Sequence, residues 1–124
     1  FATAENSLAG AYSSMTHAVV RLLDFYPNIS YKSKLINDIA IGSSHGAVCL
    51  SENHSNSSVT DIQCRAEFIP EDKVYRLKGI KTCVHGGAHD LGDNIFYIVS
   101  ARLPNSPDGV NGISLFVVPK KVRL

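Results

Sequence analysis

Apolar side chains recur every three or four residues over residues 4–25, which is the spacing of one face of an α-helix. The stripe consists of Leu8, Tyr12, Met15, Val19, Leu22 and Phe25. Pro27 ends the pattern, because a proline cannot donate to the helical ladder. A second, shorter pattern predicts a helix over residues 30–41, which Gly42 stops.

After Gly42 the period changes to short apolar runs and to alternation, both of which predict strands. Residues 47–50 form a first short apolar run, and residues 52–60 a polar loop. Over residues 61–68 the pattern alternates, and the side chains expected to face inward are Ile62, Cys64, Ala66 and Phe68.

The return arm of a hairpin is predicted from Val74 onward, with a kink at Gly79 and a continuation through Val84 to a turn at Gly86–Gly87. Residues 94–103 are the most apolar segment and are expected to form a central strand. A final strand is predicted over residues 112–118, after a loop rich in Pro, Asn and Gly.

Two helices followed by short strands with hairpin spacing predict an α+β fold: a helical segment, then a small antiparallel β-barrel or sandwich. The length of 124 residues and the apolar fraction of 44% permit a genuine core. The helical pair is too small to bury its stripe alone. Residues 1–41 are therefore expected to end a larger helical domain or to pack on a partner, and the chain, which opens at Phe1, to be an excised fragment.

A net charge of +1 predicts no strong attraction to nucleic acid or to an anionic membrane. No apolar run approaches the ~20 residues that a membrane span needs. The three cysteines lack any CxxC spacing, which predicts reduced thiols in a cytoplasmic protein.

Candidate chemistry gathers at two places. Cys83, His85 and His89 could ligate a metal, but their spacing matches no standard zinc pattern, and a core cysteine with loop histidines is the alternative. Glu52 could act as an acid or base, or could cap the loop that follows it. The loop over residues 55–58 offers hydroxyl and N–H groups to a phosphate, or is simply a solvated loop.

Six short motifs follow one another along the chain: residues 41–52 (IGSSHGAVCLSE), 75–81 (YRLKGIK), 87–91 (GAHDL), 94–95 (NI), 101–104 (ARLP) and 112–120 (GISLFVVPK). In this order and at these separations they resemble the acyl-CoA dehydrogenase family, flavoenzymes that desaturate acyl-CoA thioesters. The resemblance implies that residues 1–41 end an N-terminal all-α domain and that residues 42–124 form the middle β-barrel domain.

By this resemblance six residues would line the FAD site: Leu50, Ser51, Ser57, Cys83, Val84 and His85. Ser51 replaces the family's usual Thr and keeps a hydroxyl for the flavin ring, while Ser57 would approach the pyrophosphate. The resemblance also implies an acyl-CoA substrate and a homo-oligomer. The catalytic carboxylate usually comes from a C-terminal helical domain, so these residues would include no catalytic group and would be inactive alone.

The sequence departs from the family at the site itself. Cys83 stands where an aromatic residue covers the flavin, and His85 where Thr or Ser is usual. Asn53 replaces a proline, and residues 55–58 (SNSS) replace Ala-Gly-Ser-Asp. An aromatic ring contributes roughly 150–250 Å² of contact surface. The alternative hypothesis is therefore a non-catalytic homologue whose barrel serves as a binding or assembly module.

Overall fold

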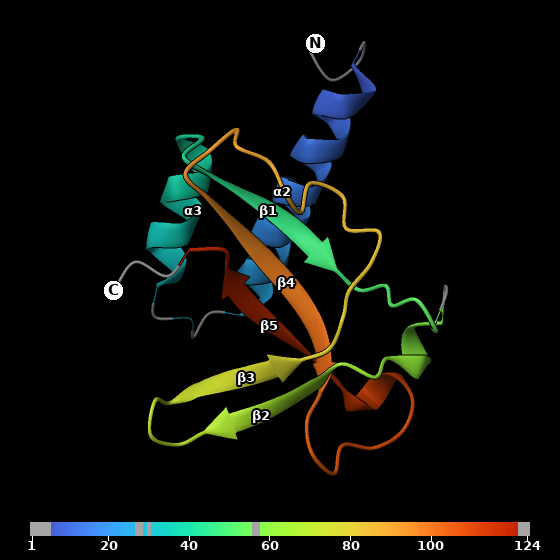
Figure 1. The fold of residues 1–124 in the computed structure, drawn as a ribbon. Coiled ribbons are helices and arrows are strands. Elements are labelled where there is room, and N and C mark those ends of the chain that lie inside the picture. The colour runs from blue at the N-terminus through green and yellow to red at the C-terminus, as the bar shows by residue number, and fades with distance from the viewer. Residues whose placement is uncertain (1–5, 27–28, 30, 56–57, 122–124) are drawn as a thin grey trace. The chain divides into compact units, whose positions relative to one another are not determined.

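The computed structural model describes residues 6–121 except residues 27, 28, 30, 56 and 57. Figure 1 shows two helices followed by five strands. The elements are α2 (Ser7–Phe25), α3 (Lys32–Ala40), β1 (Ser44–Cys49), β2 (Arg65–Ile69), β3 (Val74–Lys78), β4 (Asn94–Arg102) and β5 (Ile113–Pro119), with 3-10 turns at Val59–Asp61 and Val110–Gly112. The α+β class predicted from the sequence is confirmed.

Both predicted helices are present, with shifted ends. Helix α2 begins after Asn6, whose side-chain oxygen accepts the N–H groups of Leu8 and Ala9 at 3.0 and 3.2 Å. Such a cap satisfies N–H groups that have no partner within the helix. Residues 4 and 5, where the helix was expected to begin, and Pro27 lie outside the described residues.

The described strands form a mixed sheet. Their order is β1-β4-β2-β3, and β5 also pairs with β4, which confirms that residues 94–102 are the central strand. Strands β2 and β3 are an antiparallel hairpin in which Arg65 opposes Lys78, whereas β2 runs parallel to β4 with Arg65 opposite Arg102. This sheet is open among the described strands, so closure into an antiparallel barrel stays a prediction.

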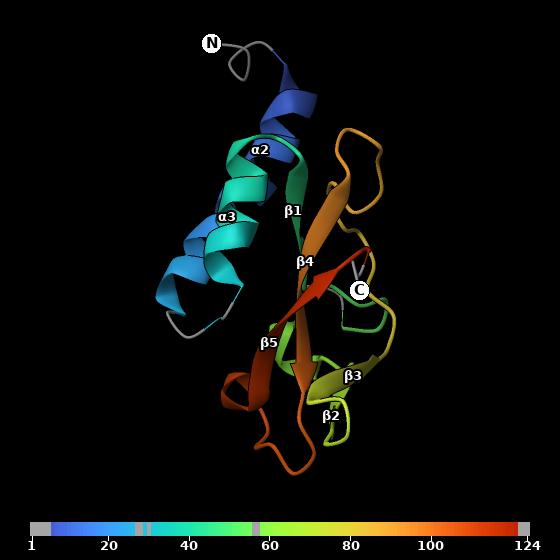
Figure 2. The same ribbon diagram turned by 90° about the vertical axis from the view of Figure 1, so that its left-hand side faces the viewer.

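The chain divides into two compact units. The first contains the described residues up to Val48, His85 to Ile98, and those from Val117 onward. Its buried core is formed by four side chains: Val19, Leu23, Leu35 and Ile98. The view in Figure 2 shows α2 and α3 on one face of β1 and β4, where Val19 and Leu22 of the predicted stripe and Leu23 beside it join the core. The ends of the stripe do not, since Leu8 is 63% and Phe25 73% exposed.

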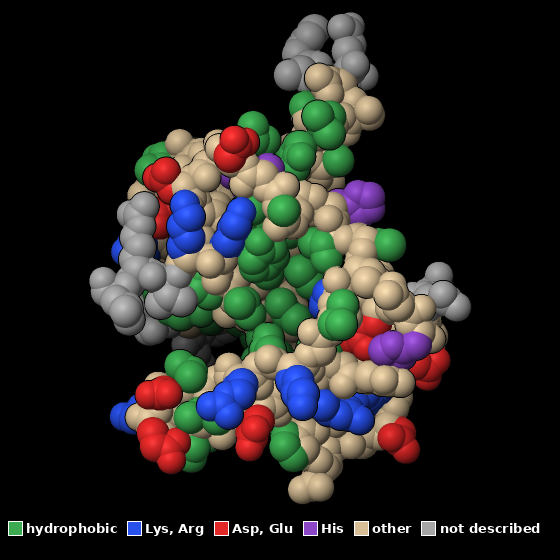
Figure 3. Space-filling view, in the orientation of Figure 1, with side chains coloured by type: hydrophobic (Ala, Val, Ile, Leu, Met, Phe, Trp, Pro, Cys, Tyr) green, Lys and Arg blue, Asp and Glu red, His purple; other side chains and the backbone are tan. Residues whose placement is uncertain are grey.

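The second unit contains residues 49–84 and 99–116. Its buried core is formed by Ile62, Cys64, Ala66 and Ala101 of β4. The alternating pattern correctly predicted that the first three face inward. On the face that Figure 3 shows, Lys and Arg side chains alternate with Asp and Glu in the region of the β2–β3 hairpin.

Three local predictions are wrong. Strand β1 spans Ser44–Cys49 instead of residues 47–50, and it includes Gly46, where an added Cβ would be 2.7 Å from the Val19 side chain. Phe68, which was expected to face inward, is 48% exposed. Its ring packs against that of Tyr75, which is itself exposed, with the two centroids 5.1 Å apart. Residues 80–84 do not continue β3, although the kink at Gly79 is present with φ of 155°.

Candidate functional site

Glu52 follows β1 and is buried, with 3% of its surface exposed. Its Oε2 accepts the N–H of Gln63 at 2.8 Å, and its Oε1 accepts the N–H of Cys64 at 3.0 Å. The carboxylate thus satisfies two backbone donors at the entry to β2. Of the two interpretations that the sequence leaves open, this geometry favours the loop cap over an acid or base.

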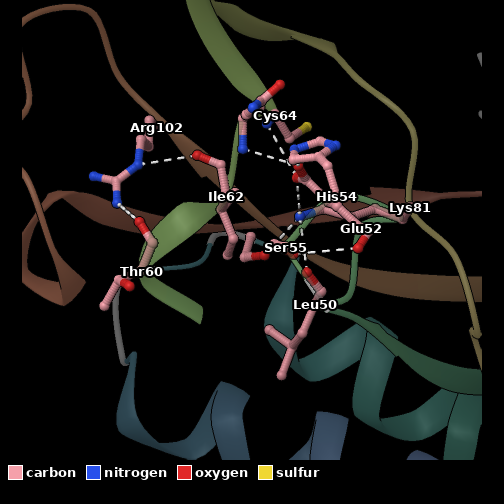
Figure 4. Close-up of polar contacts among 11 residues, drawn as sticks. Leu50, Glu52, His54, Ser55, Thr60, Ile62, Cys64, Lys81 and Arg102 are labelled. Atoms are coloured by element: carbon pink, nitrogen blue, oxygen red, sulfur yellow. Dashed lines mark hydrogen bonds and ion pairs between the residues drawn. The ribbon is translucent and has the colours of Figure 1, made fainter. Parts of the chain in front are cut away.

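Lys81 reaches the same carboxylate from the segment after the Gly79 kink. Its Nζ donates to Oε1 of Glu52 at 2.8 Å, to Oγ of Ser100 at 2.9 Å and to the carbonyl of Leu50 at 3.1 Å. Figure 4 shows this ammonium beside Glu52 and Leu50. All three of its N–H bonds therefore have acceptors inside the protein.

These contacts set the ionisation of Glu52. Burial by itself raises the pKa of the carboxyl, but the hydrogen bonds from Lys81 and from the N–H groups of Gln63 and Cys64 outweigh it and hold the pKa below its usual value. The imidazole Nε2 of His54, which is largely exposed, lies 3.1 Å from Oε2. A carboxylate with a lowered pKa and four such neighbours is a poor proton acceptor.

Four of the residues expected to face FAD lie in the second unit, on two adjacent segments. Leu50 is 41% exposed and Ser51 is half-buried. The N–H of Thr82 donates to the Ser51 carbonyl at 2.9 Å, which brings Cys83 and Val84 next to the first segment. The structure therefore assembles one surface from segments some thirty residues apart in the sequence.

The other two expected residues are not joined to this surface by any described contact. His85 is exposed and belongs to the first unit, and Ser57 lies outside the described residues. Cys83 is exposed and has φ of 53°, in the left-handed region that residues other than glycine rarely adopt. In the loop over residues 55–58, Ser55 is buried, and its hydroxyl donates to the Glu52 carbonyl at 3.3 Å.

Arg102 forms a second polar centre that sequence reasoning noted only within a motif. Arg102 is 7% exposed, and its guanidinium donates to four carbonyls, those of Thr60, Ile62, Pro107 and Gly109, at 2.6 to 3.1 Å. These acceptors lie in two different loops. The arginine therefore ties the loop over residues 104–112 to the entry of β2, which is a structural role.

A pair of histidines in the first unit was also missed. The rings of His45 and His89 meet edge-on with centroids 5.0 Å apart, and each Nε2 is buried with no hydrogen-bond partner among the described residues. Tyr12 lies edge-on to His89 at 4.9 Å. The GAHDL motif was visible in the sequence, but nothing in it indicated that His89 would meet a histidine of β1.

The metal site considered for Cys83, His85 and His89 gains no support. Within the described part of the chain, no group of three His, Cys, Asp or Glu side chains is arranged to hold a metal ion. All three cysteines are free: Cys49 and Cys64 are buried, and Cys83 is exposed. Over the same residues, no helix has the length and apolar character required to cross a membrane.

Comparisons with known proteins agree on one kind of relative. No family model matches the chain. It is 34% identical over 107 residues to a 3-methylmercaptopropionyl-CoA dehydrogenase of Ruegeria pomeroyi, covering 86% of this chain and 18% of the relative. It is 36% identical over 98 residues to an acyl-CoA dehydrogenase of Bacillus subtilis, covering 77% of this chain and 24% of the relative.

The fold has a counterpart among solved structures. A crystal structure of an FAD-dependent dehydrogenase matches with a TM-score of 0.70 and 26% sequence identity, covering 91% of this chain and 28% of that one. The chain thus spans 18% to 28% of the length of these proteins. The agreement covers both the sequence and the arrangement of the elements.

Proposed function

Because the chain belongs to the acyl-CoA dehydrogenase family, we propose that it carries part of the FAD site of a larger oxidoreductase that acts on the CH–CH bond of an acyl-CoA thioester. FAD, when bound, supplies the hydride acceptor for such a reaction. The residues of this chain would hold and orient the cofactor, and none of them is assigned a catalytic role.

The observation that carries the proposal is the surface built by residues 50–51 and 82–84. It combines the exposed apolar side chain of Leu50, the hydroxyl of Ser51 and a backbone fixed by the hydrogen bond from Thr82 to Ser51. An aromatic cofactor ring needs an apolar surface with a few well-placed polar groups. Leu50 and Ser51 therefore fit the ring of FAD, and we place Cys83 and Val84 at its other side. Roles for His85 at the ring and for Ser57 at the pyrophosphate are proposed from the resemblance alone.

The finer architecture is part of the proposal. Residues 1–41 would end an N-terminal helical domain, and residues 42–124 would form a middle domain whose sheet closes into a β-barrel. The open sheet and the stripe of α2 are compatible with further elements completing both. We further place the full-length protein in the cytoplasm as a homo-oligomer, the former supported by three free cysteines.

A second candidate function is a non-catalytic homologue that uses the fold for binding or assembly. Cys83 favours it, because an exposed thiol stands where the family places an aromatic wall over the flavin. Losing such a ring removes roughly 150–250 Å² of contact surface. Ser51 favours the enzyme, since it keeps the hydroxyl.

The visible spectrum of the purified full-length protein separates the two. The proposal predicts flavin bands, retained after gel filtration or restored by added FAD, that bleach when an acyl-CoA substrate is added without an electron acceptor. A protein that binds FAD but never bleaches with acyl-CoA thioesters of any chain length would contradict the reaction. One that takes up no FAD at all would support the binding module.

A further inference from the structure

We propose that Lys81 is a positioning residue for FAD: its buried ammonium holds the Leu50 carbonyl, and thereby aims the N–H of Ser51 at the cofactor. The inference rests on the proposed function, because it concerns the same surface. Lys81 itself is 9% exposed and would not touch the flavin. It would act through the backbone that does.

The first step concerns the direction of the peptide groups. Among the described residues no peptide bond is cis, and in a trans peptide the carbonyl and the following N–H point to opposite sides. The Leu50 carbonyl is directed into the protein by Nζ of Lys81 at 3.1 Å. The N–H of Ser51 must therefore point the other way, on the side away from the ammonium.

A second anchor fixes the next peptide. The Ser51 carbonyl accepts the N–H of Thr82 at 2.9 Å, so two consecutive carbonyls are held by the segment over residues 81–82. Neither Leu50 nor Ser51 belongs to a strand, so no ladder of strand hydrogen bonds fixes their backbone. The contacts from Lys81 and Thr82 supply that constraint.

The ammonium of Lys81 is itself held in place by two buried acceptors. Ser100 of β4 is fully buried and accepts from Nζ at 2.9 Å, while Glu52 accepts at 2.8 Å and is anchored by the N–H groups of Gln63 and Cys64. Figure 4 shows Lys81, Glu52 and Cys64 of this set. A flexible lysine is thereby converted into a fixed donor, since all three of its hydrogens are engaged.

The chemistry favours a charged donor at this place. A hydrogen bond from an ammonium polarises the peptide that accepts it, and chains of hydrogen bonds strengthen one another. The Ser51 N–H, on the far end of the polarised peptide, becomes a better donor to an electron-rich acceptor such as a flavin carbonyl or ring nitrogen. A neutral residue that merely filled the space would not do this.

The test uses the full-length protein with Lys81→Met, the double variant Glu52→Gln/Lys81→Met, and Lys81→Arg. The double variant leaves no unpaired buried charge, so it should lose less stability than the single one. FAD affinity is measured by quenching of flavin fluorescence, and the visible spectrum is recorded at saturating FAD. Lys78→Met, an exposed lysine of β3, is the matched control, and Leu35→Ala controls for lost stability alone.

We expect the Kd for FAD to be about tenfold to a hundredfold higher in both variants that carry Lys81→Met. This fold-change corresponds to the free energy of one hydrogen bond that involves a charged group. Their flavin bands should shift even when every site is filled, and Lys81→Arg should recover part of both effects. The two controls should keep the wild-type Kd and band positions.

A folded double variant with the wild-type Kd and unshifted bands would overturn the positioning role and leave the proposed function intact. So would a Lys81→Met protein whose only change is a lower thermal midpoint. A wild-type protein that binds no FAD would instead overturn the proposed function, and this inference with it.

Discussion

Lys81 and Glu52 are 29 residues apart in the sequence, yet Nζ lies 2.8 Å from Oε1. Their side chains are 9% and 2% exposed. Each charge is therefore almost removed from water and depends on the other for its stabilisation. The pair joins the end of β1, the entry to β2 and the segment after β3 at one point.

Removing the ammonium alone should be costly. Lys81→Met leaves the Glu52 carboxylate buried and unpaired, so the free energy of unfolding should fall by about 3–5 kcal/mol. Glu52→Gln/Lys81→Met removes both charges and should recover much of that loss, as urea denaturation would show. Lys78→Met, on the exposed face of the hairpin, should change it by no more than about 0.5 kcal/mol. Equal losses in the single and double variants would contradict this account.

The His45–His89 pair predicts a pH dependence of stability. Burial, and then the charges of His45 and Lys120, lower the pKa of His89, while Asp90 opposes them. The Nδ1 of His89 accepts the N–H of Leu91 at 3.3 Å, which requires the neutral ring on that side. The unfolded chain therefore binds a proton, near its ordinary pKa of about 6.5, before the folded one does.

The contribution of the neutral His89 ring to the free energy of unfolding is thus complete above about pH 6.5, and it is lost as the pH falls through the lowered pKa of His89. The Glu52 carboxyl, whose pKa is also lowered, loses its contribution only below about pH 4.3. Urea midpoints between about pH 8 and pH 5 should fall less steeply in His89→Phe than in the wild type. His17→Gln, at an exposed position of α2, should retain the slope; a His89→Phe slope as steep as the wild type would refute the assignment.

Position 112, beside the Arg102 guanidinium, has no room for a side chain. A Cβ at this position would lie 1.8 Å from the Pro107 carbonyl oxygen and 2.5 Å from the Arg102 guanidinium. Gly112→Ala should therefore displace the loop and lower the free energy of unfolding by about 3 kcal/mol, the upper part of the range for overpacking. Gly109→Ala meets open space and only the strain of its φ of 77°, so about 1–2 kcal/mol is expected. The reverse order in thermal denaturation would show that the clash is relieved.

The three thiols should differ in reactivity. Burial raises the pKa of Cys49 and of Cys64, whereas Cys83 is exposed. Because the thiolate is the reacting species, alkylation followed by peptide mass spectrometry should label Cys83 first. FAD should slow that labelling if Cys83 lies on the cofactor surface, while Cys49 and Cys64 stay slow throughout. Rapid labelling of all three in the native protein would contradict the described core.

Local pattern predicted most of the elements. The three-and-four spacing of α2 and the alternation of Ile62, Cys64 and Ala66 each report which face of one segment is apolar. The alternating face is buried, whereas only the middle of the α2 stripe is, around Val19. The pattern failed at Phe68 and Gly46, where the outcome depends on a neighbour from another segment. Alternation cannot distinguish a core position from the exposed end of a hairpin. A glycine in the sequence likewise does not show whether a distant helix will pack directly against it.

By itself the sequence determined the α+β class, the central strand expected over residues 94–103, and the family, because these depend on local periodicity and on motifs in order. Only the tertiary structure decided that Glu52 is a buried cap and Lys81 its partner. Charges cost free energy when buried unless they are paired, and the pairing joins residues that no local pattern connects. The cofactor-facing residues were named by resemblance, and what holds their backbone in place became visible only in the fold.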